Sequence, residues 1–380
     1  MNRIFIIADT HLALGYPNNS DKWFKVHQEY FKDFLLPLLK REVEEGDIIV
    51  HLGDLFDNRD IIPINILNYG LDIVVEISKI APFHIIIGNH DCWSKSSDEI
   101  NTIRPFKFIP NVFVYDKTTK IEHNGYSLVM MPYIEKRKEQ IDQIIKYKGS
   151  DYLFCHSDLN GARMHLTSVA HRNKDKIDVE EFKAFKRVYS GHIHIVDRHK
   201  NFTFVGSNFQ MDRNDYNDQK GIFVLDLETG LDEFIPNKVS PIFKKVRIKE
   251  DKDIDILEEL KNTKDYIDIE ISNNLLVNNR KLRRKLEMLL EISKFSSIAY
   301  IDDITNDLEE VTESKQEHMK LISDNQDSSI ISIQLDYEEY IKEYINTQKY
   351  ENETFKEGII SEYSQIVDIY KTNYKGLENE

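Results

Sequence analysis

The chain has 380 residues, a formal net charge of −16 and only two cysteines, Cys92 and Cys155. This length allows two or three domains with a well-buried core, and no stretch approaches the roughly 20 apolar residues that span a bilayer. The acidic balance argues against a protein that binds nucleic acid with its whole surface. Two cysteines do not make a disulfide framework and suit a reducing cytoplasm, and the N-terminal apolar run predicts a short strand, so we expect no cleavable signal.

Residues 1–235 alternate strand-like and helix-like runs, which indicates an α/β fold. A helix is expected from Ser20 to Gly46, with a kink or break at Pro37, and a second helix at 64–80. Strands are predicted at the runs IFIIA, IIVHL, HIIIG, YLFC and VYS, and at 111–115, 126–131, 203–206 and 221–227.

Five polar blocks each follow one of the five named apolar runs. They are Asp9 and His11; Asp54 and Asp57 after Gly53; Asn89, His90 and Asp91 after Gly88; His156; and His192 and His194 after Gly191. Open α/β sheets build their sites where strands end. Carboxylate, amide and imidazole groups without thiolates suit manganese, iron or zinc. Five such blocks therefore predict a centre for two divalent metal ions.

The residue types also predict individual roles. Two metals about 3.5–4 Å apart share a ligand, for which a carboxylate is well suited, and Asp54 is the natural bridge. Such a pair clamps a phosphate and activates a water. The departing oxygen needs a proton, and His90 is the best candidate donor. His51 and His84 lie within apolar runs and are expected in the core.

A second unit is expected over about 240–301, in the order strand, helix, strand, helix, strand. The strands are KKVRIK, YIDIEIS and SIAYI, and the helices are 254–261 and 278–294. The second helix carries a basic cluster from Arg280 to Lys285. That cluster is either a contact for DNA phosphates or a solvated helix face.

The chain from 303 to 331 is acidic and polar and predicts a flexible linker. Two amphipathic helices follow within 332–380, with Tyr340 on the apolar stripe of the first and Tyr363 on that of the second. Two short helices behind a linker cannot bury both stripes by themselves. They either pack on the body or bind a partner.

The polar blocks resemble those of calcineurin-like metallophosphoesterases of the SbcD/Mre nuclease family, and most closely its members in T-even phage recombination complexes. The likeness rests on GDLFDNR (53–59), GNHD (88–91) and YSGHIH (189–194). It implies a layered α/β/β/α sandwich with a small α/β capping domain and a C-terminal helical hairpin. The implied domains are a nuclease domain (1–238), a capping domain (239–302), an acidic linker (303–331) and a helix-loop-helix (332–380).

The resemblance also implies a role for each polar residue. The first metal would take Asp9, His11, Asp54 and His194, and the second Asp54, Asn89, His156 and His192. His90 takes the catalytic, non-ligand position, with Asp91 placed to orient its ring. Asp57 stands at a catalytic position where many cellular members carry a histidine.

The implied activity is that of a manganese-dependent DNA exonuclease and single-strand endonuclease in DNA end processing, recombination and repair. The C-terminal helices would bind an SbcC-type coiled-coil ATPase, and helices near 62–80 and 96–104 would form a homodimer. A phage-encoded protein would act in the host cytoplasm. The alternatives are another calcineurin-like phosphodiesterase or phosphatase with a non-DNA substrate, and a catalytically inactive assembly subunit.

Overall fold

The computed structural model describes residues 2–14, 21–94, 97–166, 168, 173, 176–248, 264–272, 282 and 297–301. Backbone contacts separate Met1–Asp302 from Asp303–Glu380, and all described residues belong to the first of these units. The expected linker and C-terminal helices lie outside the described residues. So do the basic cluster and, apart from Leu282, the helices expected at 254–261 and 278–294.

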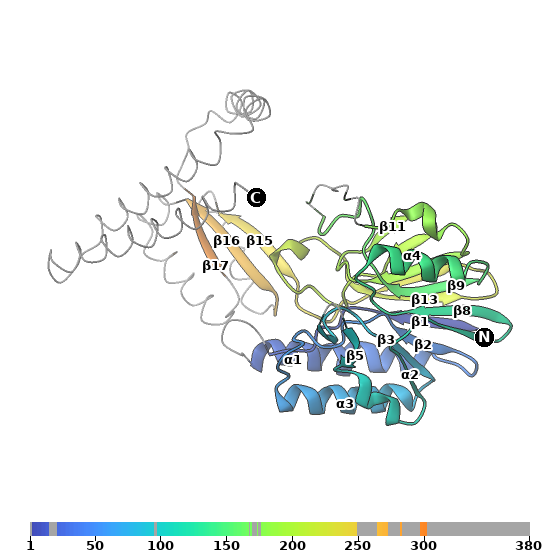
Figure 1. Ribbon diagram of the computed structural model, residues 1–380. Coiled ribbons are helices and arrows are strands. Elements are labelled where there is room, and N and C mark those ends of the chain that lie inside the picture. The colour runs from blue at the N-terminus through green and yellow to red at the C-terminus, as the bar shows by residue number, and fades with distance from the viewer. Residues whose placement is uncertain are drawn as a thin grey trace, which may run out of the picture. The chain divides into compact units, whose positions relative to one another are not determined.

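Two six-stranded sheets form the centre of the described part of the chain (Figure 1). The first has the order β14-β13-β1-β2-β3-β6, with β1 (Arg3–Ile7), β2 (Ile48–His51), β3 (Phe83–Ile86), β6 (Val112–Tyr115), β13 (Gly221–Asp226) and β14 (Asp232–Pro236). The second has the order β11-β12-β10-β9-β8-β7, with β7 (Thr119–His123), β8 (Tyr126–Met131), β9 (Tyr152–His156), β10 (Arg187–Gly191), β11 (Asp197–His199) and β12 (Phe202–Phe204). The strands predicted in residues 1–235 are confirmed.

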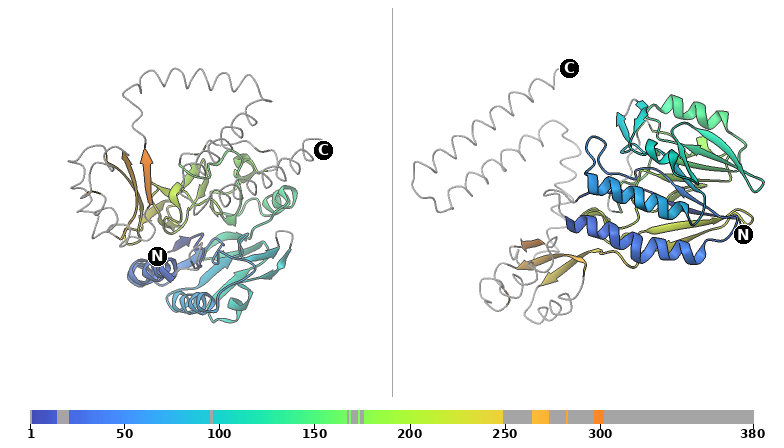
Figure 2. Two further views of the ribbon diagram at one scale, coloured as in Figure 1. Left: turned by 90° about the vertical axis from the view of Figure 1, so that its left-hand side faces the viewer. Right: turned by 90° about the horizontal axis from the view of Figure 1, so that it is seen from below.

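Helices cover the outer face of each sheet. On the first sheet α1 (Asp21–Glu29), η1 (Tyr30–Leu35) and α2 (Leu36–Glu42) follow one another along one rod, and α3 (Ile64–Ser78) lies beside that rod (Figure 2). On the second sheet the helix is α4 (Arg137–Lys146). Successive side chains of β1 point to opposite faces. Phe5 and Ile7 therefore pack in the core beneath the helices, whereas Ile4 and Ile6 pack between the two sheets. These layers confirm the expected α/β/β/α sandwich.

The helix predicted to kink or break at Pro37 changes from α-helical to π-helical geometry just before that residue. The six residues of η1 form a π-helix, and the Leu36 N–H donates to the Phe31 carbonyl, five residues back. Pro37 is the second residue of α2 and follows η1 directly, and because proline has no N–H it cannot donate to the carbonyl of the preceding helical turn. The predicted break is not found: Glu29, Leu35 and Leu36 all have right-handed helical φ and ψ, so the chain stays helical through Pro37 and a π-helical stretch takes the place of the break. The helix α3 ends at Ser78, close to the expected stop.

The second predicted unit contains the three expected strands, β15 (Phe243–Ile248), β16 (Tyr266–Ser272) and β17 (Ser297–Ile301), in one parallel sheet. The Phe243 N–H donates to Gln210 Oε1 at 2.6 Å, and Arg213 pairs with Asp268 at 2.8 Å. These contacts join the small sheet to the segment that follows β12.

The expectation of a helix near 96–104 is wrong. The strands β4 (Cys92–Ser94) and β5 (Ser97–Asn101) form an antiparallel pair. The short 3-10 helix η2 (Arg104–Phe108) follows them. The Thr102 N–H donates to the Asp91 carbonyl at 2.9 Å, so this chain segment is held extended against the GNHD loop. The structure also contains the 3-10 turns η3 (Val179–Phe182) and η4 (Arg213–Asp215). Within the described ranges, no helix has the length and apolar character to cross a membrane.

Candidate metal centre

The polar blocks meet at one edge of the sandwich because they end strands that run in parallel. In the first sheet they follow β1 (Asp9, His11), β2 (Asp54, Asp57) and β3 (Asn89, His90, Asp91). In the second sheet they end β9 (His156) or follow β10 (His192, His194). Carboxyl ends of parallel strands share one edge of a sheet, so the two stacked sheets deliver their blocks to a common place.

The glycines of the motifs allow two of these loops to touch. A Cβ on Gly88 would lie 2.1 Å from Asp54 Oδ1, and one on Gly53 would lie 2.6 Å from the Gly88 nitrogen. Gly53 also has a φ of +90°, which side chains with a Cβ disfavour. Only glycine permits the two backbones to approach so closely.

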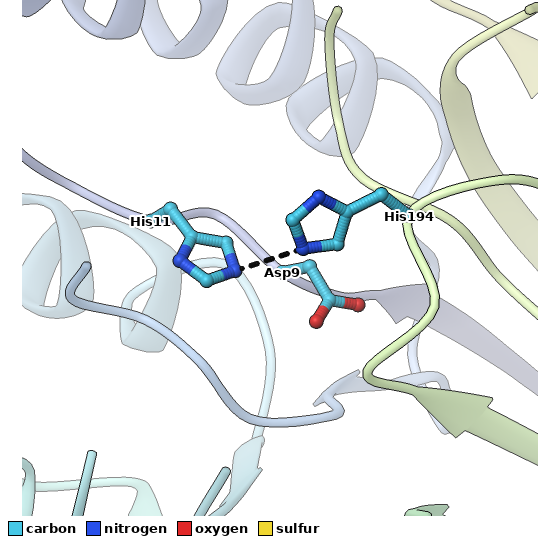
Figure 3. A group of neighbouring side chains, drawn as sticks. All are labelled: Asp9, His11 and His194. Atoms are coloured by element: carbon cyan, nitrogen blue, oxygen red, sulfur yellow. Dashed lines mark hydrogen bonds between the residues drawn. The ribbon is translucent and has the colours of Figure 1, made fainter. Parts of the chain in front are cut away.

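One group of ligand atoms consists of Asp9, His11 and His194, drawn in Figure 3. Their ligand atoms lie within 4.8 Å of one another, and His11 Nε2 is 3.1 Å from His194 Nε2. The Asp9 carboxylate also accepts the backbone N–H of His192 at 2.9 Å, which ties the loop after β1 to the loop after β10. The three side chains thus come together from both sheets.

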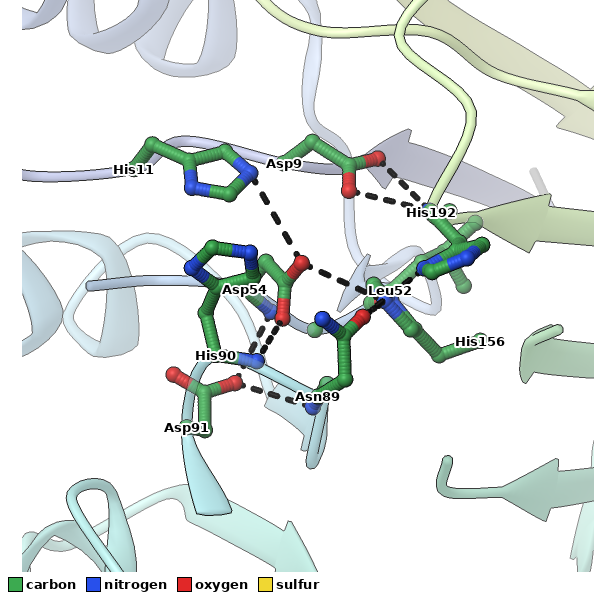
Figure 4. A network of polar contacts seen from close by, with 12 residues as sticks. Asp9, His11, Leu52, Asp54, Asn89, His90, Asp91, His156 and His192 are labelled. Atoms are coloured by element: carbon green, nitrogen blue, oxygen red, sulfur yellow. Dashed lines mark hydrogen bonds and ion pairs between the residues drawn. The ribbon is translucent and has the colours of Figure 1, made fainter. Parts of the chain in front are cut away.

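A second group consists of Asn89, His156 and His192, which lie beside Asp54 in Figure 4. Asn89 Oδ1 is 2.9 Å from His156 Nε2 and 2.7 Å from His192 Nδ1. His156 Nδ1 lies 2.7 Å from the Leu52 carbonyl oxygen. Donation of the Nδ1 proton to that carbonyl leaves the Nε2 lone pair facing the group.

Asp54 lies between the two groups. Its Oδ2 is 3.6 Å from His11 Nε2 and 3.3 Å from His156 Nε2, while Oδ1 accepts the His90 backbone N–H at 2.7 Å. The carboxylate is almost fully buried. One oxygen facing both groups is the position required of a ligand shared by two ions.

His90 lies beside the first group rather than within it. Its ring is 4.7 Å from that of His11, edge to face, and its side chain is 35% exposed. His90 Nδ1 is 2.6 Å from the main-chain oxygen of Asp57. Donation from Nδ1 to this carbonyl leaves the lone pair of the ring on Nε2.

Asp91 was expected to orient the His90 ring, and this expectation is wrong. Its Oδ2 accepts the backbone N–H groups of Asp54 at 2.8 Å and Gly88 at 2.9 Å, and Oδ1 accepts that of Leu55 at 3.1 Å. A buried carboxylate forms such bonds because unpaired backbone donors are costly inside a protein. Asp91 therefore fixes the two ligand loops, and the Asp57 carbonyl orients the His90 ring.

The buried charges of the centre shift one another's proton affinity. Burial raises the pKa of Asp9 to about 6. Burial acts the same way on Asp54, but His156 and His11 outweigh it and hold the Asp54 pKa below its usual range. Burial would lower the pKa of His156, yet Asp54 raises it to about 9. Asp54 is therefore the carboxylate that remains ionised most readily.

Backbone strain concentrates at the centre. Eight described non-glycine residues have positive φ, and four of them are predicted ligands: Asp9, His11, Asp54 and His192. Such conformations cost of order 1–3 kcal/mol each and persist where surrounding contacts enforce them, most often at functional sites. Here the contacts of Asp9 and Asp91 with neighbouring backbone N–H groups supply that enforcement.

Three residues near the centre were missed from the sequence. Asp158 Oδ1 lies 3.3 Å from His192 Nε2 and 2.9 Å from Lys176 Nζ. Lys220 Nζ donates to the His194 carbonyl oxygen at 2.7 Å. A carboxylate two residues after His156, also at a strand end, was the available signal for Asp158. Lys176 and Lys220 carry no local motif.

The donor atoms fit two divalent cations. Imidazole nitrogens and carboxylate or amide oxygens converge from several sides, and at least two imidazoles have their outer nitrogen paired with an acceptor. Lone pairs directed at one another are unfavourable unless a proton or a cation lies between them. When bound, such ions would neutralise a phosphate and promote attack by water.

Strand-end carboxylates and imidazoles in an α/β/β/α sandwich define a metallophosphoesterase. The chain belongs to the calcineurin-like phosphoesterase family, whose profile matches residues 2–196, and the expected family is thereby confirmed.

Two viral proteins of similar sequence agree with this assignment. The chain is 26% identical over 335 residues to Exonuclease subunit 1 of Enterobacteria phage T4, which covers 86% of this chain and 94% of that protein. It is 27% identical over 198 residues to Putative phosphoesterase 244L of Invertebrate iridescent virus 6, with 50% and 68% covered. A solved archaeal phosphodiesterase aligns with 13% identity and a TM-score of 0.34, over 62% of this chain and 99% of that one.

Proposed function

We propose that this chain is the nuclease subunit of an ATPase–nuclease complex that processes DNA ends in recombination and repair. The observation that carries the proposal is Asp54 lying between two groups of ligand atoms. The chain that holds them is similar to a phage exonuclease subunit over 94% of that subunit's length. The activity would be phosphodiester hydrolysis, as an exonuclease and a single-strand endonuclease, with manganese as the metal.

In this proposal the first ion is held by Asp9, His11, Asp54 and His194, and the second by Asp54, Asn89, His156 and His192. His90 contacts the substrate phosphate or donates a proton to the departing oxygen. Its ring is held by the Asp57 carbonyl, so Nε2 is the nitrogen that acts. Asp91 keeps the loops of Asp54 and His90 together.

The partner is proposed from the relative's designation as a subunit and from the two amphipathic stripes expected at 332–380. Amphipathic helices bind grooves and coiled coils through apolar residues spaced three and four apart. We propose an SbcC-type coiled-coil ATPase as that partner, in the cytoplasm, with 239–302 as a capping domain and 303–331 as the linker.

A homodimer is proposed on the apolar side chains exposed along 61–71 and 93–100. Ile61 is 72% exposed, Ile64 76%, Trp93 55% and Ile100 62%. Exposed apolar patches mark interaction sites. Ile64→Asp should give a monomer in light scattering where the wild type is a dimer, and a monomeric wild type would refute the dimer.

The function is tested with purified protein, manganese and three substrates: linear duplex DNA, single-stranded DNA and a phosphopeptide. DNA should be cleaved and the phosphopeptide should not. His90→Ala should lower kcat by about 10²–10⁴-fold and retain two ions, whereas Asp54→Ala should lose metal and activity together. Cleavage of the phosphopeptide alone would favour a phosphatase, and no turnover with two ions bound would favour an inactive assembly subunit.

A further inference from the structure

Two histidines of the centre, His11 and His192, each have a carboxylate at the outer ring nitrogen. His11 Nε2 faces His194 Nε2 at 3.1 Å, and its Nδ1 lies 3.0 Å from Asp57 Oδ1. His192 Nδ1 faces Asn89 Oδ1 at 2.7 Å, and its Nε2 lies 3.3 Å from Asp158 Oδ1. In both histidines one ring nitrogen faces another candidate ligand and the other faces a carboxylate, although the two nitrogens exchange these places.

We propose that Asp57 and Asp158 are positioning residues that prepare one histidine for each of the two metal ions. The inference rests on the proposed dinuclear centre and adds how each half of it is held. A neutral imidazole carries one N–H, and donating it to a carboxylate leaves the lone pair on the inner nitrogen. The carboxylate also fixes the ring plane and makes the imidazole a better ligand.

The surroundings of Asp158 suit this role. Lys176 Nζ lies 2.9 Å from the same Oδ1 that faces His192, so the lysine both balances the charge and restrains the carboxylate. The Asp158 side chain is 34% exposed. A partly exposed carboxylate with a cationic neighbour can be replaced without leaving a buried charge unpaired.

Asp57 acts on two neighbours through different atoms. Its carboxylate pairs with His11, and its main-chain oxygen accepts from His90 Nδ1 at 2.6 Å. Substituting the side chain removes the support of His11 and a longer contact of 3.9 Å between Asp57 Oδ1 and His90 Nδ1, and keeps the 2.6 Å bond of His90 to the Asp57 carbonyl. The Asp57 side chain is 52% exposed, so its loss should not unfold the body.

The proposal is tested by manganese binding to the full-length chain without substrate. Asp57→Ala and Asp158→Ala should each lower the affinity for one manganese ion about 10–100-fold. The affinity for the other ion should stay at the wild-type value. The double variant should bind both ions with lower affinity, because each carboxylate supports a histidine in a different half of the centre. Free manganese is followed by electron paramagnetic resonance and total binding by calorimetry.

The matched controls are Asp60→Ala and Asp178→Ala, which remove exposed carboxylates. Asp60 is close to Asp57 in the sequence, and Asp178 Oδ1 accepts from Asn160 Nδ2 at 2.7 Å, close to Asp158. Both should bind two ions as the wild type does. Asp57→Asn and Asp158→Asn keep side-chain size and an acceptor oxygen, and should give intermediate affinities. These variants also serve if either alanine variant does not fold.

Four outcomes decide the matter. Wild-type affinity for both ions in Asp57→Ala or Asp158→Ala would overturn the proposal for that residue. A double variant that still holds one ion tightly would overturn the division between halves. Complete loss of one ion from Asp57→Ala at millimolar manganese would mark Asp57 as a direct ligand and overturn the positioning role. A wild-type protein that binds fewer than two ions would instead refute the dinuclear centre itself.

Discussion

Lys220 is a buried cation on which one side of the metal centre depends, and replacing it should be costly. Its side chain is 3% exposed, and Nζ lies 2.7 Å from both Asp215 Oδ1 and Asp218 Oδ2. A third contact, also of 2.7 Å, goes to the His194 carbonyl oxygen. Lys220→Met keeps the aliphatic length and removes the charge with all three contacts.

The size of the effect follows from the two carboxylates left behind. Both side chains are only 6% exposed, and burial raises the pKa of Asp218 even with the lysine present. Breaking a buried pair by removing one partner costs about 3–5 kcal/mol. The His194 carbonyl still accepts the Ser207 N–H at 2.9 Å, so the loop should loosen rather than detach.

Urea unfolding followed by tryptophan fluorescence measures this cost. Trp23 packs 5.8 Å from Phe209, ring centre to ring centre, and Phe209 lies on the segment that Lys220 secures. The control is Lys186→Met, which breaks a 2.7 Å pair with Asp151 by removing a lysine that is 60% exposed. Such surface pairs contribute about 0–1 kcal/mol.

Lys220→Met should therefore lower the unfolding free energy about 3–5 kcal/mol and weaken manganese binding, while the control does neither. A loss for Lys220→Met no larger than that of the control would refute the reasoning. Adding Asp215→Asn and Asp218→Asn to Lys220→Met should restore part of the stability, because the unpaired charges are removed. No recovery in this triple variant would show that charge burial is not the source of the cost.

Three further outcomes are expected. Gly88→Ala should abolish metal binding measured by calorimetry, because its Cβ would lie 2.1 Å from Asp54 Oδ1; retention of two ions would contradict the close approach. Burial lowers the pKa of His84 to about 4, below the value of about 6.5 in the unfolded chain. The unfolded state therefore binds this proton first, and the free energy of unfolding is highest above pH 6.5 and falls as the pH is lowered. Wild type should lose about 2 kcal/mol more than His84→Gln between pH 7.5 and 5 in urea titrations, and equal losses would rule this out. Chelation of the metals should lower the melting temperature, since ions bound only by the folded state stabilise it; an unchanged melting temperature in excess chelator would count against a bound centre.

The sequence was sufficient for the framework of the centre. Strand-end blocks placed Asp9, Asp54 and His156 at one edge of the fold, because periodicity predicts strands and parallel strands share an edge. A change in the helix at Pro37 was also predictable, because the effect of a missing N–H is local.

Contacts between distant segments were not predictable in this way. The partners of Asp91 are backbone N–H groups in the loop of Asp54, and loop backbones carry no periodic signal. Lys176 and Lys220 act through residues that only the fold brings near. The pair of β4 and β5 depends likewise on a backbone contact between Thr102 and Asp91.

Each half of the centre takes side chains from both sheets, and this has a consequence for how the protein is made. Asp9 and His11 leave the ribosome long before His194, and Asp54 long before His192. Lys220 and β13, which pairs with β1, come later still. With the ligands proposed above, a nascent chain would hold no complete set until the second sheet has docked on the first. Unfinished copies of the chain would therefore lack the proposed phosphoester cleavage.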